Sequence, residues 1–308
     1  MTKLRDEKIL VTGPAGQIAF PLAARLATDN EVWGIARFKD PKTRERVEKA
    51  GIHTRSIDLA DPSWGDLPDD FTLVLHLAAT IVPGHDFDSA IRINAEGTGK
   101  VMQRHRSARA CLMMSTCAVY LSPEDGDRGV LETDPLGGSN QPYAPTYCVS
   151  KIAQEAVGRF SAEAFGLPTT IARMNAAYGD NGGLPAMMVD PILAGHPIPI
   201  VPGHELCSPI HEEDIFDHVP GLLAAADVPA TITNWGGDEP VDFRELCRYI
   251  GELLGVEAKF VESPDGIHQY NLDKTKRAKL AGPCKVPWKE GVRRSIAARC
   301  PNRELRSV

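Results

Sequence analysis

The sequence lacks the features of several protein classes. It has seven cysteines, an odd number, and no two of them form a CxxC pair. We therefore expect neither a disulfide framework nor a bound metal, but reduced thiols in a cytoplasmic protein. Runs of about 18 apolar residues, the length that crosses a membrane, are absent, so no membrane span is expected.

Basic residues are also fewer than acidic residues. The 308 residues include 34 Lys and Arg against 41 Asp and Glu, which gives a formal net charge of −7. Proteins that bind nucleic acids or anionic membrane surfaces usually carry basic patches, so we expect neither partner. Residues 1–8 are polar and charged and do not resemble the apolar core of a secretory signal.

The chain does contain an alternation of short apolar runs and amphipathic stretches. This order, without hairpin signals, predicts right-handed βαβ crossovers and a doubly wound parallel sheet, the α/β Rossmann architecture. The apolar run 72–77 is continuous, which is typical of a strand buried on both faces. We expect strands at 9–11, 32–36, 72–77, 110–114 and 169–173, and helices at 18–27, 41–50, 91–106, 147–165 and 184–194.

The pattern becomes less regular in the second half of the chain, where Pro and Gly cluster between residues 180 and 209. We predict a dinucleotide-binding domain at 1–175 and a smaller substrate lobe at 176–308, with some segments of the lobe returning to the main sheet. Residues 121–145 are rich in Pro, Gly, Ser and Asp, which predicts a long surface loop beside the site.

A glycine-rich turn lies between the first strand and the first helix. Gly13 suits the tight turn, Gly16 lets the backbone approach a pyrophosphate, and Ala19 is small enough for close packing of helix on strand. Gln17 and Ile18 would open the helix, whose N-terminus favours a phosphate charge. Glycine spacing alone would also fit a purely structural turn, but its place between a strand and a helix favours a dinucleotide.

The end of the second strand usually selects between NAD and NADP. An acidic residue there binds the ribose hydroxyl of NAD, but this sequence has Ala36 and then Arg37. A guanidinium suits a 2′-phosphate in charge and in geometry. The sequence therefore favours NADP over NAD. The alternative is that Arg37 belongs to a solvated basic surface loop.

Tyr147 and Lys151 are four residues apart, which places them on one face of a helix. A nearby ammonium stabilises a phenolate and brings tyrosine toward the working range of an acid–base catalyst. The strand before this helix ends in Ser115 and Thr116, at the sheet edge where ligands of open α/β sheets bind. These three features together predict a catalytic site.

The sequence resembles the extended short-chain dehydrogenases/reductases of the NAD-dependent epimerase/dehydratase family along nearly its whole length. The resemblance rests on the glycine turn and on a series of short motifs. These are Asp58-Leu59, His76-Leu77-Ala78-Ala79, Asn94-Ala95-Glu96-Gly97-Thr98, Ser115 to Tyr120, Tyr147 to Lys151, Arg173 to Gly179 and Ile210 to Ile215.

The resemblance implies a role for particular positions. Thr116 would be the catalytic hydroxyl, Tyr147 the acid/base and Lys151 its cationic partner, which also holds the nicotinamide ribose. Arg173 is expected to be a buried or loop-anchoring cation. Further cofactor contacts are implied for Asp58 and Leu59 near the adenine, for Leu77, Ala78, Ala79, Asn94 and Ser115, and for Met174 and Asn175 on the nicotinamide side.

The sequence departs from the family at informative positions. Dehydratases of this type follow the catalytic threonine with Asp-Glu, whereas Cys117 and Ala118 stand here, which disfavours dehydration. Nucleotide-sugar epimerases usually carry a diphosphate-binding arginine where this chain has Cys207, and a substrate-facing asparagine where it has Ala176. Lys276, Arg277 or Lys279 would have to replace that arginine. Cys117 and Cys148 are expected to be core thiols rather than a redox pair.

The first hypothesis is an NAD(P)-dependent oxidoreductase acting on a small molecule with a carbonyl or a secondary hydroxyl. The alternative is a nucleotide-sugar epimerase that retains its NAD, and a non-catalytic NADP sensor on the same fold is a third. The resemblance also implies a homodimer that pairs through the helix after His85 and the helix that carries Lys151.

Overall fold

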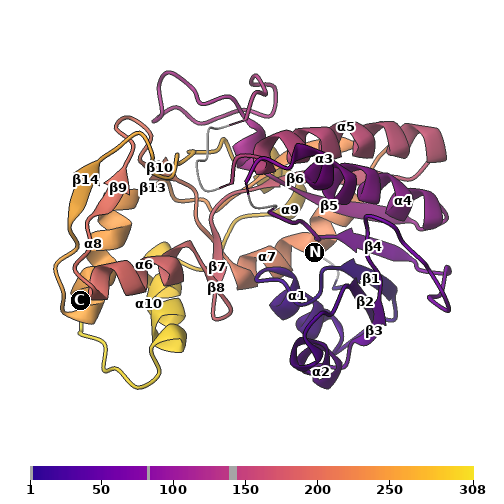
Figure 1. The fold of residues 1–308 in the computed structure, drawn as a ribbon, viewed down its shortest axis with the longest axis horizontal. Helices are drawn as coiled ribbons and strands as arrows, with labels where there is room; N and C mark the ends of the chain where they lie inside the picture. Colours follow the sequence, from indigo (N-terminus) through magenta and orange to yellow (C-terminus); the bar gives the residue numbers. More distant parts are fainter. Residues whose placement is uncertain (1–2, 82–83, 139–143) are drawn as a thin grey trace.

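The computed structural model describes residues 3–81, 84–138 and 144–308. Within these residues a seven-stranded sheet has the order β3-β2-β1-β4-β5-β6-β12, and every neighbouring pair is parallel. This is the predicted doubly wound sheet (Figure 1). Its strands are β1 (Lys8–Thr12), β2 (Glu31–Ala36), β3 (His53–Ser56), β4 (Leu73–His76), β5 (Ala110–Thr116), β6 (Thr169–Met174) and β12 (Thr231–Trp235).

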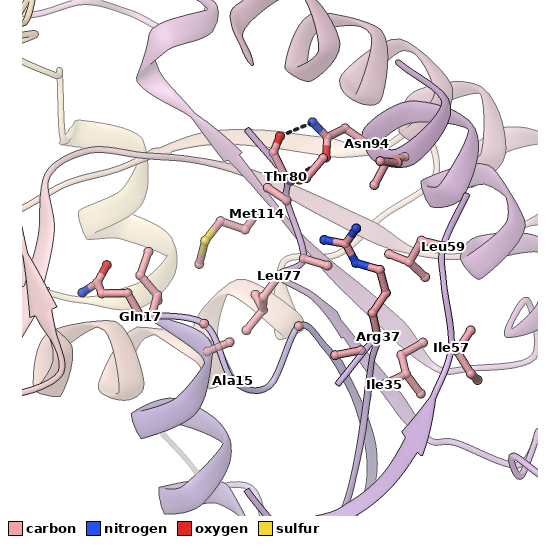
Figure 2. Close-up of a pocket in the computed structure, with 18 of the residues that line it drawn as sticks. Ala15, Gln17, Ile35, Arg37, Ile57, Leu59, Leu77, Thr80, Asn94 and Met114 are labelled. Atoms are coloured by element: carbon pink, nitrogen blue, oxygen red, sulfur yellow. Dashed lines mark hydrogen bonds between the residues drawn. The ribbon is translucent and has the colours of Figure 1, made fainter. Parts of the chain in front are cut away.

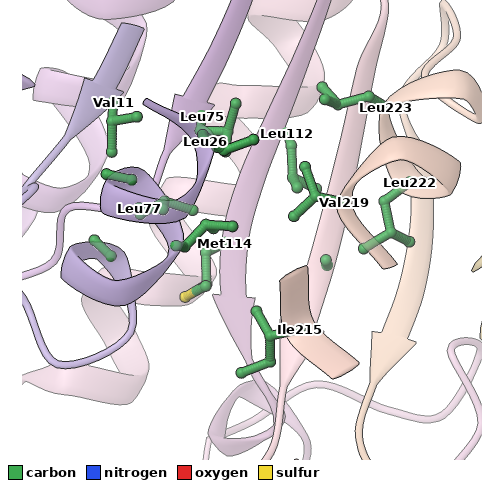
Figure 3. Close-up of a cluster of buried hydrophobic side chains, with 14 of the residues drawn as sticks. Val11, Leu26, Leu75, Leu77, Leu112, Met114, Ile215, Val219, Leu222 and Leu223 are labelled. Atoms are coloured by element: carbon green, nitrogen blue, oxygen red, sulfur yellow. The ribbon is translucent and has the colours of Figure 1, made fainter. Parts of the chain in front are cut away.

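Helices cover both faces of this sheet because successive strand residues point to opposite sides. Val11 and its neighbours Leu75 and Leu112 pack under α1 and α7, while Leu10 belongs to a separate cluster under α4 and α5. Figure 3 shows the first cluster between the strands and the two helices. The helices are α1 (Ala19–Leu26), α2 (Pro41–Lys49), α3 (Phe87–Ile91), α4 (Gly97–Arg104), α5 (Tyr147–Phe165), α7 (Glu212–Ala224) and α9 (Thr275–Ala281).

The helix predicted at 91–106 is present, as part of a helical segment at 87–104, but it is not regular throughout. A π-helical turn, η1 (Arg92–Glu96), separates α3 from α4. Such widened turns occur where side-chain bonds compete with regular helix geometry, frequently at functional sites. Here Asn94 lies in the turn, and its amide bonds the backbone of Thr80 and the hydroxyl of Ser150.

Residues after 175 contribute to several hydrophobic clusters. β12, α7 and α9 join the main sheet and its cover, and Trp235 of β12 is fully buried there. The remaining elements enclose a second cluster (Figure 1). They are β7 (Ala177–Gly179), β8 (Gly182–Gly183), α6 (Leu184–Leu193), β9 (Ile198–Ile200), β10 (Leu206–Cys207), β11 (Ile210–His211), β13 (Val241–Asp242), α8 (Phe243–Leu254), β14 (Phe260–Glu262) and α10 (Trp288–Arg299). The boundary between residues 175 and 176 stays a proposal.

The segment that follows β5 is more firmly held than the expected surface loop. It begins with a 3-10 turn, η2 (Cys117–Val119), and isolated bridges pair Tyr120 with Leu136 and Val130 with Leu272. Val130 is 1% exposed. Residues 139–143, within the same predicted loop, lie outside the described residues. No helix in the described part of the chain is long and apolar enough to cross a membrane.

Candidate active site

A cavity of about 390 Å³ opens at the carboxyl ends of β1, β2, β4 and β5. Figure 2 shows it between the glycine turn at Gln17, the end of β2 at Arg37 and the π-helical turn at Asn94. Most of the predicted cofactor residues line this cavity: Gly13, Gly16, Gln17, Ile18, Arg37, Asp58, Leu59, Leu77, Ala78, Ala79, Asn94 and Tyr147. The fold therefore brings together predicted residues that are up to 134 positions apart in the chain, from Gly13 to Tyr147.

The glycine turn requires glycine at its first position. Gly13 has φ of +68°, and a Cβ there would lie 3.0 Å from the Cα of Ala78. Ile18 caps α1 without a side-chain acceptor, so the helix start offers donors to an anion. The β7–β8 connection supports the turn, because the Asn181 amide donates to the Gln17 carbonyl at 2.9 Å.

The acidic and basic residues at the two adjacent strand ends differ in their bonding. Arg37 is exposed, and its guanidinium has no hydrogen bond or ion pair with any described residue. Figure 2 shows it extending past Ile35 toward Leu59. Asp58 caps a turn by accepting a bond from the Ala60 amide at 3.0 Å. Arg37 is thus the cation available to an anionic group here, and Asp58 combines a turn cap with a place in the lining.

A buried polar network lies beneath the cavity. The Thr12 hydroxyl lies 2.9 Å from Nδ1 of His76 and accepts bonds from the amides of Leu77 and Ala78. The Thr98 hydroxyl donates to the Asn94 carbonyl and so accepts from Nε2 of His76 at 2.7 Å. These partners assign the proton to Nε2. Burial, and secondarily the charge of Lys151, lowers the pKa of His76 to about 3, so His76 is a neutral support for the end of β4.

Asn94 connects this network to the helix of the predicted catalytic pair. Its carbonyl accepts from the Thr80 amide at 2.8 Å, and its amide donates to the Thr80 carbonyl and the Ser150 hydroxyl. Ser150 in turn donates to the Tyr147 carbonyl at 2.8 Å. Both N–H donors of the Asn94 side chain and its oxygen thus fix the first turn of α5 against the loop after β4.

Tyr147 and Lys151 lie in the first two turns of α5, next to the end of β5. Tyr147 lines the cavity, whereas Lys151 is 1% exposed and its Nζ donates to the Met114 carbonyl at 2.8 Å. Burial lowers the pKa of Lys151 to about 7, and the charge of Glu155 opposes that change. Thr116 is 9% exposed and its hydroxyl accepts from the Ala118 amide at 3.2 Å.

Besides Lys151, three predicted cofactor residues do not line the cavity. The Ser115 hydroxyl donates to the buried carboxylate of Glu155, and the Asn175 amide donates to the Tyr270 carbonyl. Met174 is 6% exposed and packs in the core on the α1 side of the sheet. Their predicted cofactor contacts stay predictions. Arg173 is buried, pairs with Glu155 and donates to the Glu132 carbonyl at 3.0 Å, which confirms the expected loop-anchoring cation.

The departures from the family pattern have clear structural settings. Cys117 is held as a protonated thiol, because burial raises its pKa to about 12. Cys207 is fully buried and its thiol donates to the Val241 carbonyl at 3.3 Å. Arg277 is fully buried, donating to Asp238 and to the Gly282 carbonyl, while Lys276 and Lys279 are exposed. Arg277 is therefore committed elsewhere and does not replace the missing arginine.

Several cavity residues were missed at the sequence level. They are Ala15, Ile35, Ala36, Ile57, Thr80, Ile93 and Met114. Their positions just before strand ends would have pointed to Ile35, Ala36 and Met114, because carboxyl ends of parallel strands meet at one edge. No local pattern identifies Ile93, whose position depends on the π-helical turn. Among the described residues, no cluster of His, Cys, Asp or Glu could hold a metal ion.

Solved structures with the same fold include two epimerases. UDP-glucuronic acid 4-epimerase from Bacillus cereus superposes with a TM-score of 0.80 at 20% identity, covering 96% of this chain and 99% of that one. UDP-N-acetylglucosamine 4-epimerase from Methanobrevibacter ruminantium M1 gives 0.82 at 18% identity, covering 97% and 100%. At these identities the likeness establishes the fold.

Some relatives match this chain over only part of their own length. One is the trifunctional UDP-glucose 4,6-dehydratase/UDP-4-keto-6-deoxy-D-glucose 3,5-epimerase/UDP-4-keto-L-rhamnose-reductase RHM2 of Arabidopsis thaliana, 25% identical over 96% of this chain and 47% of the relative. The chain thus spans about half the length of such relatives. Another is L-arabinose 1-dehydrogenase (NAD(P)(+)) of Haloferax volcanii, 28% identical over 52% of this chain and 63% of the relative.

The family model described as the NAD dependent epimerase/dehydratase family matches residues 9–231, which is most of the chain and includes both the glycine turn and the Tyr147–Lys151 helix. With the seven-stranded parallel sheet and the cavity at its carboxyl edge, this match establishes that the chain is an enzyme of the NAD-dependent epimerase/dehydratase family.

Proposed function

We propose that the protein is an NADP-preferring oxidoreductase that interconverts a carbonyl and a secondary alcohol on a small, uncharged substrate, with Tyr147 as the acid/base. One observation carries this proposal: Tyr147 lines the glycine-turn cavity while Lys151, one turn further along α5, bonds the end of the strand that leads to Thr116.

The residues fit a nicotinamide dinucleotide. Gly13 leaves room where a Cβ would contact Ala78, and the uncapped start of α1 offers donors to a pyrophosphate. Arg37 reaches into the lining at the end of β2 without a partner in the described chain, which suits a 2′-phosphate. When bound, the nicotinamide supplies or accepts the hydride.

The proton steps belong to the chain's own side chains. Tyr147 donates a proton to the substrate oxygen during reduction and removes it during oxidation, and Thr116 orients that oxygen. The ammonium of Lys151 stabilises the phenolate of Tyr147. Because Lys151 has a pKa of about 7, this assistance weakens as the pH rises above neutrality.

The substrate side argues for a compound without a diphosphate. The diphosphate-binding arginine expected of nucleotide-sugar epimerases is replaced by buried Cys207, and Arg277 is already bound to Asp238. A diphosphate would lose a fork of donors at this place. The L-arabinose 1-dehydrogenase similarity adds a precedent for a free sugar as substrate in a relative. We therefore propose a monosaccharide or a polyol of similar size.

The alternative is a UDP-sugar 4-epimerase that keeps its NAD, the activity for which both solved neighbours are named. In that case the same hydride step would run in both directions with no net redox change. It would predict a nucleotide that remains bound through purification, whereas the oxidoreductase must exchange its cofactor at every turnover.

The test measures both activities on one preparation. Purified protein is assayed with NADP⁺ or NAD⁺ and L-arabinose, D-xylose or D-galactose, with NADPH and simple ketones, and separately with UDP-glucose and UDP-glucuronic acid. We expect turnover of an uncharged substrate and its loss in Tyr147→Phe. Full turnover in Tyr147→Phe, or conversion of UDP-sugars by tightly held NAD, would overturn the proposal.

Two further expectations belong to the proposal. Val149 and Phe160 of α5 are 43% and 69% exposed, and their spacing places them on one face of the helix, which favours the homodimer through α5 and the helix after His85. Cytoplasmic location remains a proposal from the cysteine content.

A further inference from the structure

Glu155 lies one turn beyond Lys151 on α5 and is 2% exposed. Its carboxylate accepts the Ser115 hydroxyl at 2.5 Å, and Nε and Nη2 of Arg173 at 2.9 and 2.7 Å. Ser115 is the neighbour of Thr116. One carboxylate thus joins the helix of the acid/base pair to the ends of two adjacent strands, β5 and β6.

Arg173 extends this connection to the segment after Thr116, residues 120–132, which we call the substrate wall. Its third donor, Nη1, bonds the Glu132 carbonyl at 3.0 Å, and its guanidinium stacks 4.7 Å from the centre of the Tyr120 ring. Asn234 also holds the wall. Its backbone N–H donates to the Glu132 carboxylate at 2.8 Å, and its side-chain amide donates to the Val130 carbonyl.

The substrate wall is adjacent to the proposed catalytic threonine. Cys117, which follows Thr116, packs against a cluster in which Tyr120 and Val130 of the wall meet Tyr270 and Leu272. Moving the wall would therefore move the surface next to Thr116. Few residues separate Thr116 from the substrate wall. The side chains that hold these two segments therefore set their relative position.

We propose that Glu155 is a positioning residue for the reaction proposed above, on which this inference rests: it orients the Thr116 strand end through Ser115 and holds the substrate wall through Arg173. It touches neither the cofactor cavity nor the reacting atoms. Its removal should weaken substrate binding while leaving cofactor binding unchanged, because Glu155 is absent from the cavity lining.

The charge of Glu155 supplies a second, independent readout. Around Lys151 stand Tyr147 and Glu155 on its own helix, neutral His76 on β4 and, behind Glu155, Arg173 on β6. The carboxylate raises the pKa of Lys151 against the effect of burial. Replacing it with an amide leaves Arg173 without its counter-ion, and both changes disfavour the ammonium.

The experiment compares Glu155→Gln and Arg173→Lys with Glu163→Gln, which makes the same change on the exposed face of α5. Arg173→Lys keeps a cation beside Glu155 but cannot make the bidentate pair and the Glu132 bond together. With whichever of L-arabinose, D-xylose or D-galactose the wild type oxidises as the probe, we expect both test variants to raise the substrate KM about tenfold with the Kd for NADPH within about twofold. In Glu155→Gln the alkaline limb of activity should also shift to lower pH.

Hydrogen exchange gives a measurement that needs no substrate. The Val130 and Asn234 amides, bonded to Asn271 and Glu132, should exchange about tenfold faster in both variants than in Glu163→Gln. Unchanged substrate KM, pH profile and exchange in a folded variant would refute the inference, as would a proportional loss of cofactor and substrate binding. If Glu155→Gln does not fold, Arg173→Lys decides. Activity retained in Tyr147→Phe would instead refute the proposed function.

Discussion

The ammonium group of Lys151 donates a hydrogen bond of 2.8 Å to the carbonyl of Met114, and the surrounding protein leaves Lys151 only 1% exposed. A cation in such a position destabilises the folded state, because burial holds its pKa at about 7 instead of the usual 10.5. The unfolded chain binds this proton more tightly than the folded protein does. The free energy of unfolding should therefore increase as the pH rises from 7 to 10.5.

Lys151→Met should therefore be inactive but more stable, by on the order of 2 kcal/mol at pH 6. The advantage should shrink as the pH rises toward 10.5, and above that pH the lysine is neutral in both states. Urea denaturation at pH 6 and pH 9.5 checks this. Lys100→Met, at a half-buried lysine on α4, is the control. A less stable Lys151→Met at pH 6 would contradict the prediction.

Arg37 should determine the preference between the two dinucleotides. Arg37→Ala removes the guanidinium that reaches the cavity without a protein partner, and we expect the KM for NADPH to rise about tenfold or more. The KM for NADH should change little. The neighbouring exposed Lys39→Ala serves as the control. Equal effects on both cofactors would argue that Arg37 is only a surface cation.

Gly13→Ala should damage the cofactor site as well as the fold. The new Cβ would be strained by φ of +68° and would press on Ala78 at 3.0 Å. Gly166, at the end of α5, has φ of +65° and nothing within 4 Å of such a Cβ, so Gly166→Ala isolates the strain. We expect a loss of about 1 kcal/mol for Gly166→Ala and more for Gly13→Ala.

Only Gly13→Ala should also weaken NADPH binding, measured by fluorescence titration. Equal dinucleotide affinity in the two glycine variants would show that the turn does not approach the cofactor.

Buried histidines should make the protein sensitive to acid. The ring of His105 lies edge-on to Trp64 and Phe71. Burial lowers the pKa of His105 to about 4. The unfolded chain takes up this proton first, so stability is present above pH 6.5 and falls as the pH drops toward 4. His105→Phe should reduce that loss by up to about 3 kcal/mol, measured by urea denaturation from pH 7 to pH 4. Exposed His196→Gln should leave the slope unchanged.

The proposed homodimer can be tested at Phe160. This side chain is 69% exposed on α5, so a charge there would not disturb the core of the protomer. Phe160→Glu should convert a dimer into a monomer in sedimentation analysis without lowering the melting temperature of the protomer. A wild-type protein that sediments as a monomer at micromolar concentration would refute the dimer.

Much of this fold could be predicted from the sequence because its signals are local. The run at Leu73 to Leu75 is apolar at every position, and Gly13 marks a turn that other residues adopt only under strain. The order of the sheet follows from right-handed crossovers. The three proposed catalytic residues could also be found, since a strand end and a helical spacing identify them.

The parts that sequence reasoning missed depend on contacts between distant segments. The π-helical turn at Asn94 depends on partners at Thr80 and Ser150, the latter 56 residues away. The pairing of Glu155 with Arg173 gives no local pattern, and the fastening of the substrate wall follows from it. Helix periodicity describes one segment at a time and cannot show which buried polar groups will meet.

The position of β12 sets the timing of assembly during synthesis. This strand completes the sheet beside β6, and α7 covers the neighbouring face, yet Trp235 is translated 61 residues after Met174. A nascent chain that has reached only the end of β6 presents an open strand edge and an uncovered apolar surface. The dinucleotide-binding half therefore cannot finish folding on the ribosome until much of the second half has emerged.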